Sequence, residues 1–280
     1  MVENPRSGFE NFILIISTAS RVKRPLEGFC SPSLYFFQMD LFIHTNETPE
    51  DLANAFALQL IDWINESAGY DFHLVLSGGK TPKLLFSLLA GKYLKVVPWQ
   101  KIHFWWGDER MVPTDDPESN FGVINELLFS KIKLSQSQIH RIKGEAKPIE
   151  EAKRYGFEIQ SLVPTINGYP EFDLIMLGLG DDGHTASIFP DQMQLMESDE
   201  ITRVAFQPIT GQLRITLTGK VLNNAKKVAF LVSGASKSGI FDEIIHNTIN
   251  SSVYPASHIR PEGELHWFID KNLAMRNGLK

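Results

Sequence analysis

From Met39 onward, short runs of apolar residues alternate with longer segments in which apolar residues recur every third or fourth position. The short runs predict buried strands, and the periodic segments predict amphipathic helices. The predicted strands span residues 72–76, 102–106, 172–177 and 228–232. The predicted helices include residues 119–129, 150–162 and 236–249. A further helix is expected to begin after Thr48, an N-cap residue followed by Pro49 and two acidic residues.

Each predicted strand is predominantly apolar, without a regular alternation of polar residues, and helical segments separate the strands along the chain. This arrangement is typical of a parallel sheet with both faces covered by helices. We therefore expect an α/β fold with three layers, α/β/α, around a mostly parallel, Rossmann-like sheet. Such sheets bind ligands beyond the carboxyl ends of their strands, so the chemistry is expected in the loops that follow the strands.

Residues 1–38 differ from the rest of the chain, because they show no clear period and contain three prolines. We expect a single domain over residues 39–280, preceded by an extension that is either flexible or lies upstream of a natural start at Met39. The extension has a short apolar run at residues 12–16, but basic residues follow it. A secretory signal peptide places the basic residues before a longer apolar run, so no signal peptide is predicted.

The composition is that of an ordinary soluble globular protein. Of the 280 residues, 43% are hydrophobic and 21% are charged. No stretch approaches the roughly 20 apolar residues of a membrane-spanning helix. The formal net charge of −6 provides no overall basic field for nucleic acid or an anionic membrane surface. Cys30 is the only cysteine, so no internal disulfide can form, and a reducing, cytoplasmic location is expected.

Three of the predicted strands are followed by loops of similar design, in which small residues lead into a helix start. The sequence reads Ser-Gly-Gly-Lys-Thr-Pro after strand 72–76, and Ser-Gly-Ala-Ser-Lys after strand 228–232. After strand 172–177 it reads Gly-Leu-Gly-Asp-Asp-Gly-His-Thr. These three loops are the first candidates for a binding site.

The first loop suits a phosphate group. Gly78 and Gly79 allow the backbone to approach an anion, and the N–H groups at a helix start can donate to it. The Lys80 ammonium and the Thr81 hydroxyl add further donors. A tight turn with Thr81 as N-cap and Pro82 at the first helical position would explain the same residues, and both interpretations can hold together.

A charged segment, Asp-Glu-Arg at residues 108–110, follows strand 102–106 after one glycine, and Asn120 lies at the start of the next predicted helix. Such a segment is normally a solvated turn with an ion pair that adds little stability. At the carboxyl end of a strand, however, Arg110 could hold a phosphate with its planar guanidinium. We favour the functional interpretation because of this position.

Residues 180–185, Gly-Asp-Asp-Gly-His-Thr, carry the most informative chemistry. Carboxylates beside a histidine on a glycine-flanked turn can orient the imidazole and raise its basicity for general-base catalysis. A metal cluster and a plain Asp-Gly turn are the alternatives, but no second His or Cys lies nearby at ligand spacing. We therefore predict no metal site, and we expect structural roles for most of the other histidines.

Two further basic residues are placed to converge on the anion site of the first loop. Arg214 lies in an alternating strand that ends in a predicted helix cap, Thr218, and Lys237 lies in the third loop. Alone, a strand arginine is usually at an edge or in a surface ion pair, and a lysine at a helix start is usually solvated. The chain has no Gly-x-Ser-x-Gly segment and no recognisable base for Ser77, so covalent catalysis is less favoured.

Together these segments resemble the 6-phosphogluconolactonase family, within the wider glucosamine-6-phosphate isomerase/deaminase superfamily. The segments that carry the resemblance are residues 77–82, 106–113 with 119–120, 173–190, 214–218, 232–237 and 255–257. The resemblance covers about residues 39–275. Because these segments occur in the order of the family pattern, together they indicate the family far more specifically than any single segment does.

The resemblance implies hydrolysis of 6-phospho-D-glucono-1,5-lactone to 6-phosphogluconate, the second step of the oxidative pentose phosphate pathway, with no metal or cofactor. His184 would act as the general base on a water that attacks the lactone carbonyl, and Asp182 would hold the imidazole. The phosphate would lie against residues 79–81, and which basic residue contacts it stays open. The candidate site comprises His184 and Asp182 for catalysis, with Gly78, Gly79, Lys80, Thr81, Asp108, Arg110, Asn120, Arg214 and Lys237 for substrate binding.

Two other functions remain as alternatives. The pattern of glucosamine-6-phosphate deaminases carries Asn-Glu-Pro after the Gly-His segment, whereas this chain reads Thr-Ala-Ser-Ile-Phe-Pro after His184 and lacks that carboxylate. A non-catalytic phosphosugar sensor would use the same loops but would not need a general base. The expected partner is a small phosphosugar lactone, without nucleic acid or membrane, and the expected state is a monomer or a small homo-oligomer.

Overall fold

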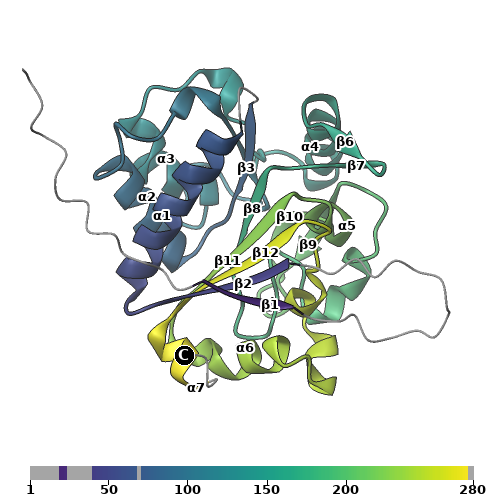
Figure 1. The fold of residues 1–280 in the computed structure, drawn as a ribbon. Helices are drawn as coiled ribbons and strands as arrows, with labels where there is room; N and C mark the ends of the chain where they lie inside the picture. The colour runs from purple at the N-terminus through teal and green to yellow at the C-terminus, as the bar shows by residue number, and fades with distance from the viewer. Residues whose placement is uncertain (1–18, 24–39, 68–70, 277–280) are drawn as a thin grey trace, which may run out of the picture.

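The computed structural model describes residues 19–23, 40–67 and 71–276. Its central sheet has seven strands in the order β1-β2-β12-β11-β8-β3-β4 (Figure 1). All neighbouring strands are parallel except β1, which pairs antiparallel with β2. The bounds are β1 (Ala19–Lys23), β2 (Asp40–Asn46), β3 (Phe72–Leu76), β4 (Ile102–Trp106), β8 (Leu174–Leu177), β11 (Lys227–Val232) and β12 (Glu264–Asp270). The predicted, mostly parallel sheet is confirmed.

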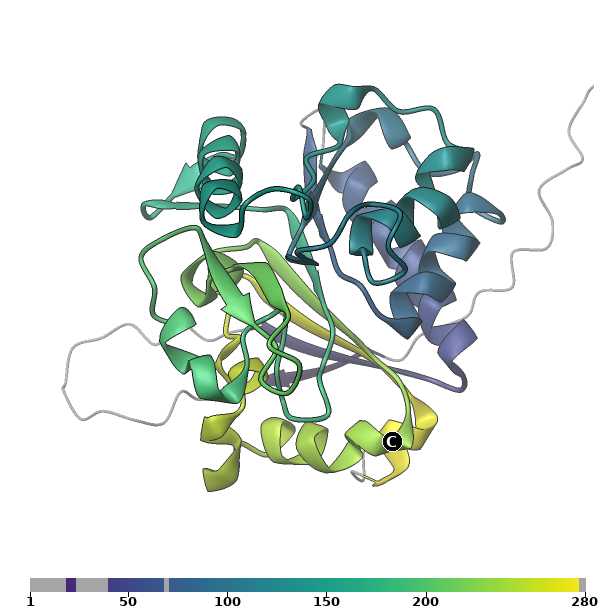
Figure 2. The same ribbon diagram turned by 180° about the vertical axis from the view of Figure 1, so that it is seen from behind.

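Helices cover both faces of this sheet. α1 connects β2 to β3 and α2 connects β3 to β4, whereas α6 connects β11 to β12 in the opposite direction along the sheet. Because crossovers between parallel strands are right-handed, α1 and α2 lie on one face and α6 on the other (Figure 1, Figure 2). The bounds are α1 (Pro49–Glu66), α2 (Lys80–Ala90), α3 (Asn120–Leu127), α4 (Pro148–Leu162), α5 (Gly219–Asn223), α6 (Ser238–Ile245) and α7 (Lys271–Arg276). The three-layer prediction is therefore also confirmed.

A second, antiparallel sheet in the order β5-β10-β9 lies beside the central sheet. Its strands are β5 (Asp108–Arg110), β9 (Thr202–Phe206) and β10 (Leu213–Leu217), and a two-stranded hairpin is formed by β6 (Thr165–Ile166) and β7 (Tyr169–Pro170). Gly107 joins the two larger sheets, because its N–H donates to Leu76 and its carbonyl accepts from Leu217. This link holds the charged segment after β4 against the carboxyl end of β3.

The ends of two helices show how local sequence determines local structure. Thr48 caps α1 as predicted, with its hydroxyl accepting from the Asp51 N–H at 3.1 Å. The helix predicted over residues 236–249 instead ends at Ile245. Asn247 there adopts φ 49°, and its N–H and that of Thr248 bond back to the carbonyls of residues 244 and 243. This is a Schellman ending with asparagine in the left-handed conformation, which stops the helix.

Only part of the predicted extension lies within the described residues. Ala19–Lys23 form the edge strand β1, paired with β2 in the register Ala19↔His44 to Lys23↔Asp40. The remainder of the extension, including Cys30, lies outside the described residues. The division into an extension over 1–38 and one domain over 39–280 stays a prediction.

Several of the other histidines are buried within the fold. His44 Nε2 lies 3.1 Å from His266 Nδ1. His73 Nδ1 accepts a hydrogen bond from the Trp105 indole N–H at 3.1 Å. Burial lowers the pKa of both His44 and His73 to about 4, so both are neutral near pH 7. Their hydrogen bonds and burial agree with the structural roles expected for them.

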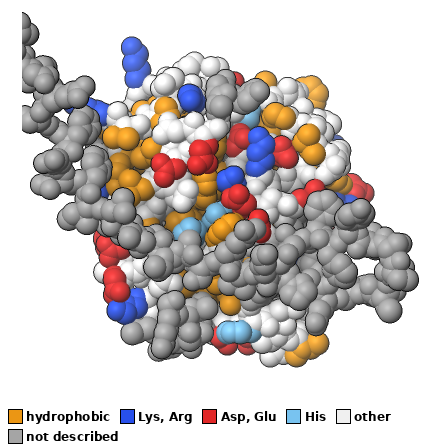
Figure 3. Space-filling model, viewed as in Figure 1, with side chains coloured by type: hydrophobic (Ala, Val, Ile, Leu, Met, Phe, Trp, Pro, Cys, Tyr) orange, Lys and Arg blue, Asp and Glu red, His pale blue; other side chains and the backbone are white. Residues whose placement is uncertain are grey.

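The surface carries both signs of charge. On the face seen in Figure 3, Lys and Arg side chains are scattered among Asp and Glu, without a broad basic area. Within the described ranges, no helix is both long enough and apolar enough to cross a membrane.

Candidate active site

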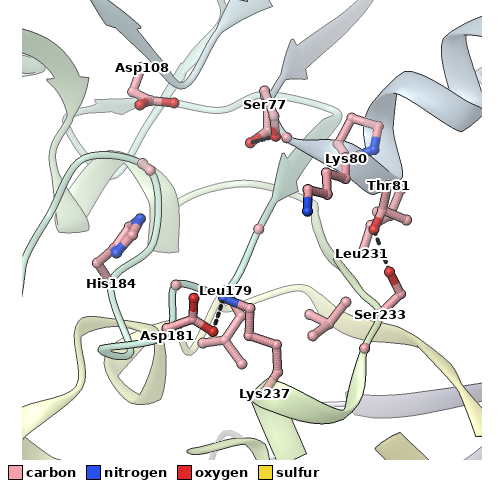
Figure 4. A pocket seen from close by; sticks show the side chains of 18 of the residues that line it. Ser77, Lys80, Thr81, Asp108, Leu179, Asp181, His184, Leu231, Ser233 and Lys237 are labelled. Atoms are coloured by element: carbon pink, nitrogen blue, oxygen red, sulfur yellow. Dashed lines mark hydrogen bonds and ion pairs between the residues drawn. The ribbon is translucent and has the colours of Figure 1, made fainter. Parts of the chain in front are cut away.

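The loops that follow β3, β8 and β11 meet around a cavity of about 590 Å³. β3 and β8 are neighbours, and the chain leaves them toward opposite faces of the sheet, which opens a crevice at their carboxyl ends. Every residue of the predicted site except Asp182 lines this cavity. In Figure 4, His184 and Asp108 lie on one side of the cavity, and Lys80 and Thr81 lie on the other.

The first loop has the backbone geometry that suits an anion. Gly79 has φ 115° and ψ 176°, a conformation that side-chain-bearing residues rarely adopt, and it serves as the N-cap of α2. The first N–H groups of α2 have no partner within the helix and are available to an anion. The alternative interpretation placed Thr81 at the N-cap and Pro82 at the first helical position. In the structure they are instead the second and third residues of α2. The Thr81 hydroxyl instead lies 2.9 Å from that of Ser233, which ties the first loop to the third.

Asn120 ties the first loop to the charged segment. Its side chain lies so close to Gly78 that a Cβ atom at position 78 would be 2.0 Å from Asn120 Oδ1. The Asn120 amide also donates to the Asp108 carbonyl at 3.0 Å. The absence of a side chain at position 78 therefore allows the two segments to approach each other.

The segment 108–110 is not a solvated turn, because Asp108 and Glu109 are buried in β5. The register of β5 on β10 places Arg110 opposite Arg214. The Nε atoms of both arginines are buried and have no hydrogen-bond partner within the described ranges. Burial lowers the pKa of the Arg214 guanidinium, Asp108 opposes this change, and Arg110 adds to it. Two neighbouring guanidinium groups at one cavity wall favour an anionic ligand.

His184 and Asp182 form a hydrogen-bonded pair. His184 Nδ1 lies 2.5 Å from Asp182 Oδ1, which also accepts from the His184 backbone N–H at 3.1 Å. Partial burial acts to raise the pKa of Asp182, but the hydrogen bonds and charge of His184 hold that pKa below its usual range. With the carboxylate at Nδ1, we assign the proton of the neutral imidazole to Nδ1, which leaves Nε2 as the basic nitrogen.

The glycines around this pair allow its tight geometry. A Cβ atom on Gly180 would lie 2.0 Å from His184 Nδ1 and 2.6 Å from Asp182 Oδ1. Gly183 adopts φ 81°, and a Cβ atom there would lie 2.4 Å from the Tyr254 ring. The turn therefore requires glycine on both sides of the carboxylate.

The third loop contributes Lys237 to the lining of the cavity. Its Nζ lies 2.7 Å from Asp181 Oδ1, and both side chains line the cavity (Figure 4). Lys80, in contrast, has no ion pair with any residue in the described part of the chain. Lys237 therefore lines the cavity as one half of an ion pair, whereas Lys80 lines it without a carboxylate partner among the described residues.

Two residues that the sequence interpretation missed organise the site. The fully buried Ser187 donates to Asp108 Oδ2 at 2.6 Å and lies 3.4 Å from the Arg214 guanidinium. The Glu109 carboxylate accepts from the backbone N–H groups of residues 110, 120 and 121. Burial raises the pKa of Glu109, and these backbone hydrogen bonds oppose the rise. Both residues lie within segments that carry the resemblance, but their roles depend on contacts with other segments, Asp108 for Ser187 and the start of α3 for Glu109.

The described residues contain no group of three or more His, Cys, Asp or Glu side chains placed to hold a metal ion. The cavity instead combines hydroxyl, guanidinium and ammonium groups with one histidine–carboxylate pair. The positive and hydroxyl groups of such a set can bind the anionic group of a molecule, while the histidine transfers a proton at another part of the same molecule.

Comparison with known proteins identifies relatives of this chain. A family described as glucosamine-6-phosphate isomerases/6-phosphogluconolactonase matches residues 47–267. A 6-phosphogluconolactonase from Haemophilus influenzae is 43% identical over 210 residues, which cover 74% of this chain and 88% of that protein.

Solved structures show the same relationship. A crystal structure described as devB protein aligns with a TM-score of 0.78 and 42% identity, covering 84% of this chain and 99% of that one. The 6-phosphogluconolactonase from Trypanosoma brucei aligns with a TM-score of 0.76 and 29% identity, covering 84% and 97%. The resemblance drawn from the motifs is confirmed: this chain belongs to the glucosamine-6-phosphate isomerase and 6-phosphogluconolactonase family.

Proposed function

We propose that this protein hydrolyses 6-phospho-D-glucono-1,5-lactone to 6-phospho-D-gluconate, a carboxylic ester hydrolysis of the oxidative pentose phosphate pathway. One observation carries the proposal: a single cavity holds both a cluster of anion-binding groups and a histidine–carboxylate pair. The name of the Haemophilus influenzae relative, 43% identical over 74% of this chain, supports the same activity. A cytoplasmic location is part of the proposal, and the oligomeric state stays a prediction.

The phosphate group of the substrate would bind at the first loop. The start of α2 at Gly79 to Thr81 offers backbone N–H groups, and the Lys80 ammonium lies at the same side of the cavity (Figure 4). Lys237, Arg110 and Arg214 add positive charge around the cavity. Binding the phosphate there would position the lactone ring across the cavity, so that binding energy from a remote group is used at the reacting carbon.

The chemical step would take place beside His184. Nε2 removes a proton from a water molecule while the water oxygen forms a bond to the lactone carbonyl carbon. The bond from that carbon to the ring oxygen then breaks, and the imidazolium returns the proton to the ring oxygen as it becomes the hydroxyl of the open product. Asp182 holds the ring through Nδ1 and stabilises the positive charge that develops on it.

The arrangement favours hydrolysis over the other activity of the family. A deaminase-isomerase of the pattern described above uses a carboxylate shortly after the catalytic histidine. In this chain, residues 184–190 contain no carboxylate. The Phe189 ring packs against the His184 ring, with their centroids 4.6 Å apart. An apolar ring at this position offers no group for ring-opening proton transfer.

Turnover by the wild-type protein tests the proposal. Freshly generated 6-phosphogluconolactone is followed with 6-phosphogluconate dehydrogenase as the reporter, against the spontaneous rate, and ammonia release from glucosamine 6-phosphate is measured in parallel. We expect fast lactone hydrolysis and no ammonia. A lactone rate equal to that of buffer would refute the proposal, and tight phosphosugar binding without turnover would indicate a sensor.

Gly180→Ala is expected to lower kcat on the order of tenfold, because the new methyl group displaces His184 and Asp182 from each other. The matched control is Gly239→Ala in α6, where an added Cβ atom meets nothing within 4 Å. The measurement is lactone hydrolysis by both variants, together with their melting temperatures. An unchanged kcat in Gly180→Ala would show that the spacing of the pair is not important.

A further inference from the structure

One acidic residue of the cavity has no place in the mechanism above. Asp181 directly precedes the carboxylate of the histidine pair, and its side chain is 76% exposed. It nevertheless forms an ion pair with Lys237, whose side chain is only 19% exposed. The Lys237 hydrogen bond holds the pKa of the Asp181 carboxyl below its usual range, despite slight desolvation, and the Ser236 hydroxyl adds to this effect. The carboxylate is therefore ionised near neutral pH.

The ion pair joins two loops that come from different strands. Asp181 belongs to the loop after β8, which carries the base, and Lys237 belongs to the loop after β11. Figure 4 shows the pair below Lys80, which forms no ion pair with any residue that the structure describes. A phosphate group that recruits Lys237 must either separate the lysine from Asp181 or bring its own negative charge close to that carboxylate.

We propose that Asp181 is a positioning residue that holds Lys237 as its counter-ion and competes with the phosphate of the ligand, so that it weakens the binding of phosphosugars. This inference rests on the proposed function and concerns the affinity of the same site. The competition acts on substrate and product through the same lysine. Asp181 thereby favours product release.

The test is Asp181→Asn, which keeps the size of the side chain and removes its charge. We expect KM for the lactone and the dissociation constants of 6-phosphogluconate and inorganic phosphate to fall about three- to fivefold, as for the loss of one partly exposed charge interaction. The change falls on KM and on these dissociation constants rather than on kcat. It becomes smaller at high ionic strength, because salt screens exposed charges.

A matched control and a double-mutant cycle make the result specific. Asp199→Asn removes a carboxylate that pairs with Lys220 on the surface, outside the residues that line the cavity, and is expected to change nothing. In a Lys237→Met background, adding Asp181→Asn is expected to have no effect on phosphate binding, because the partner is already absent.

Two results would overturn the inference. Weaker phosphate binding in Asp181→Asn would show that the carboxylate orients Lys237 toward the ligand rather than competing with it. An equal gain in the Lys237→Met background would show that Asp181 acts on the ligand without the lysine. Because titration with inorganic phosphate needs no turnover, these results are separate from a failure of the lactonase activity itself.

Discussion

His184→Ala is expected to lower kcat for 6-phosphogluconolactone hydrolysis by about 10³-fold, within the range for loss of a general base. His184 lines the cavity, and we assign Nε2 as its basic nitrogen because Nδ1 contacts Asp182. Without it, water must attack the carbonyl unassisted, although we still expect the first loop to hold the phosphate group of the ligand. The side chain is 30% exposed, so its removal leaves the core intact.

The chain offers a matched control for this variant. His246 on the surface also pairs with a carboxylate, that of Asp242 at 3.0 Å, and it lies outside the cavity lining. His246→Ala is expected to retain the wild-type kcat. The measurements are the coupled lactone assay and the affinity for 6-phosphogluconate by calorimetry. Loss of turnover with unchanged affinity supports the base, whereas loss of both would place His184 in binding.

Arg214→Gln is expected to raise KM for the lactone by about 10²-fold, because it removes one of the positive charges that we propose attract the phosphate group of the substrate. Arg214 lies opposite Arg110 at the cavity wall, and its Nε has no hydrogen-bond partner among the described residues. Glutamine retains polar atoms for Ser187 and Asp108 while removing the positive charge. KM and kcat are measured together, with the melting temperature as a check on folding.

The control for this variant is Arg203→Gln on the neighbouring strand β9. Arg203 is exposed and pairs with Glu200, so removing its charge leaves the cavity unchanged. We expect wild-type KM and kcat for this variant. If Arg214→Gln lowered kcat at unchanged KM, the guanidinium would act on the reacting carbonyl and not on the phosphate.

Local sequence was sufficient to predict the layers and the cavity-forming loops. The apolar runs of β3, β4, β8 and β11 required burial on both faces, and this requirement determines a parallel sheet. Since the carboxyl ends of parallel strands meet at one edge, the three loops could be expected to converge. The sequence did not show that α6 ends at Ile245. The ending depends on Asn247 in the left-handed conformation, and glycine rather than asparagine is the usual residue there.

The fine structure of the site depended on contacts between distant segments. Ser187 reaches Asp108 across 79 positions of the chain, and Lys237 meets Asp181 only because β8 and β11 are neighbours. Glu109, in the charged segment taken as solvated in one interpretation, is buried against the start of α3. Pairing partners of this kind follow from the order of the strands, which local periodicity does not encode.

The central claim is that a neutral imidazole at position 184 removes the proton from the attacking water. Its most direct test is the rate of 6-phosphogluconate formation by His184→Gly with added free imidazole, corrected for the reaction that imidazole catalyses without the enzyme. The account predicts a slow variant whose rate rises with imidazole concentration until the vacated space is filled, while 6-phosphogluconate binds as it does to the wild type. A variant that retains the wild-type rate without imidazole, or one that binds product normally and does not respond to imidazole, would contradict the account.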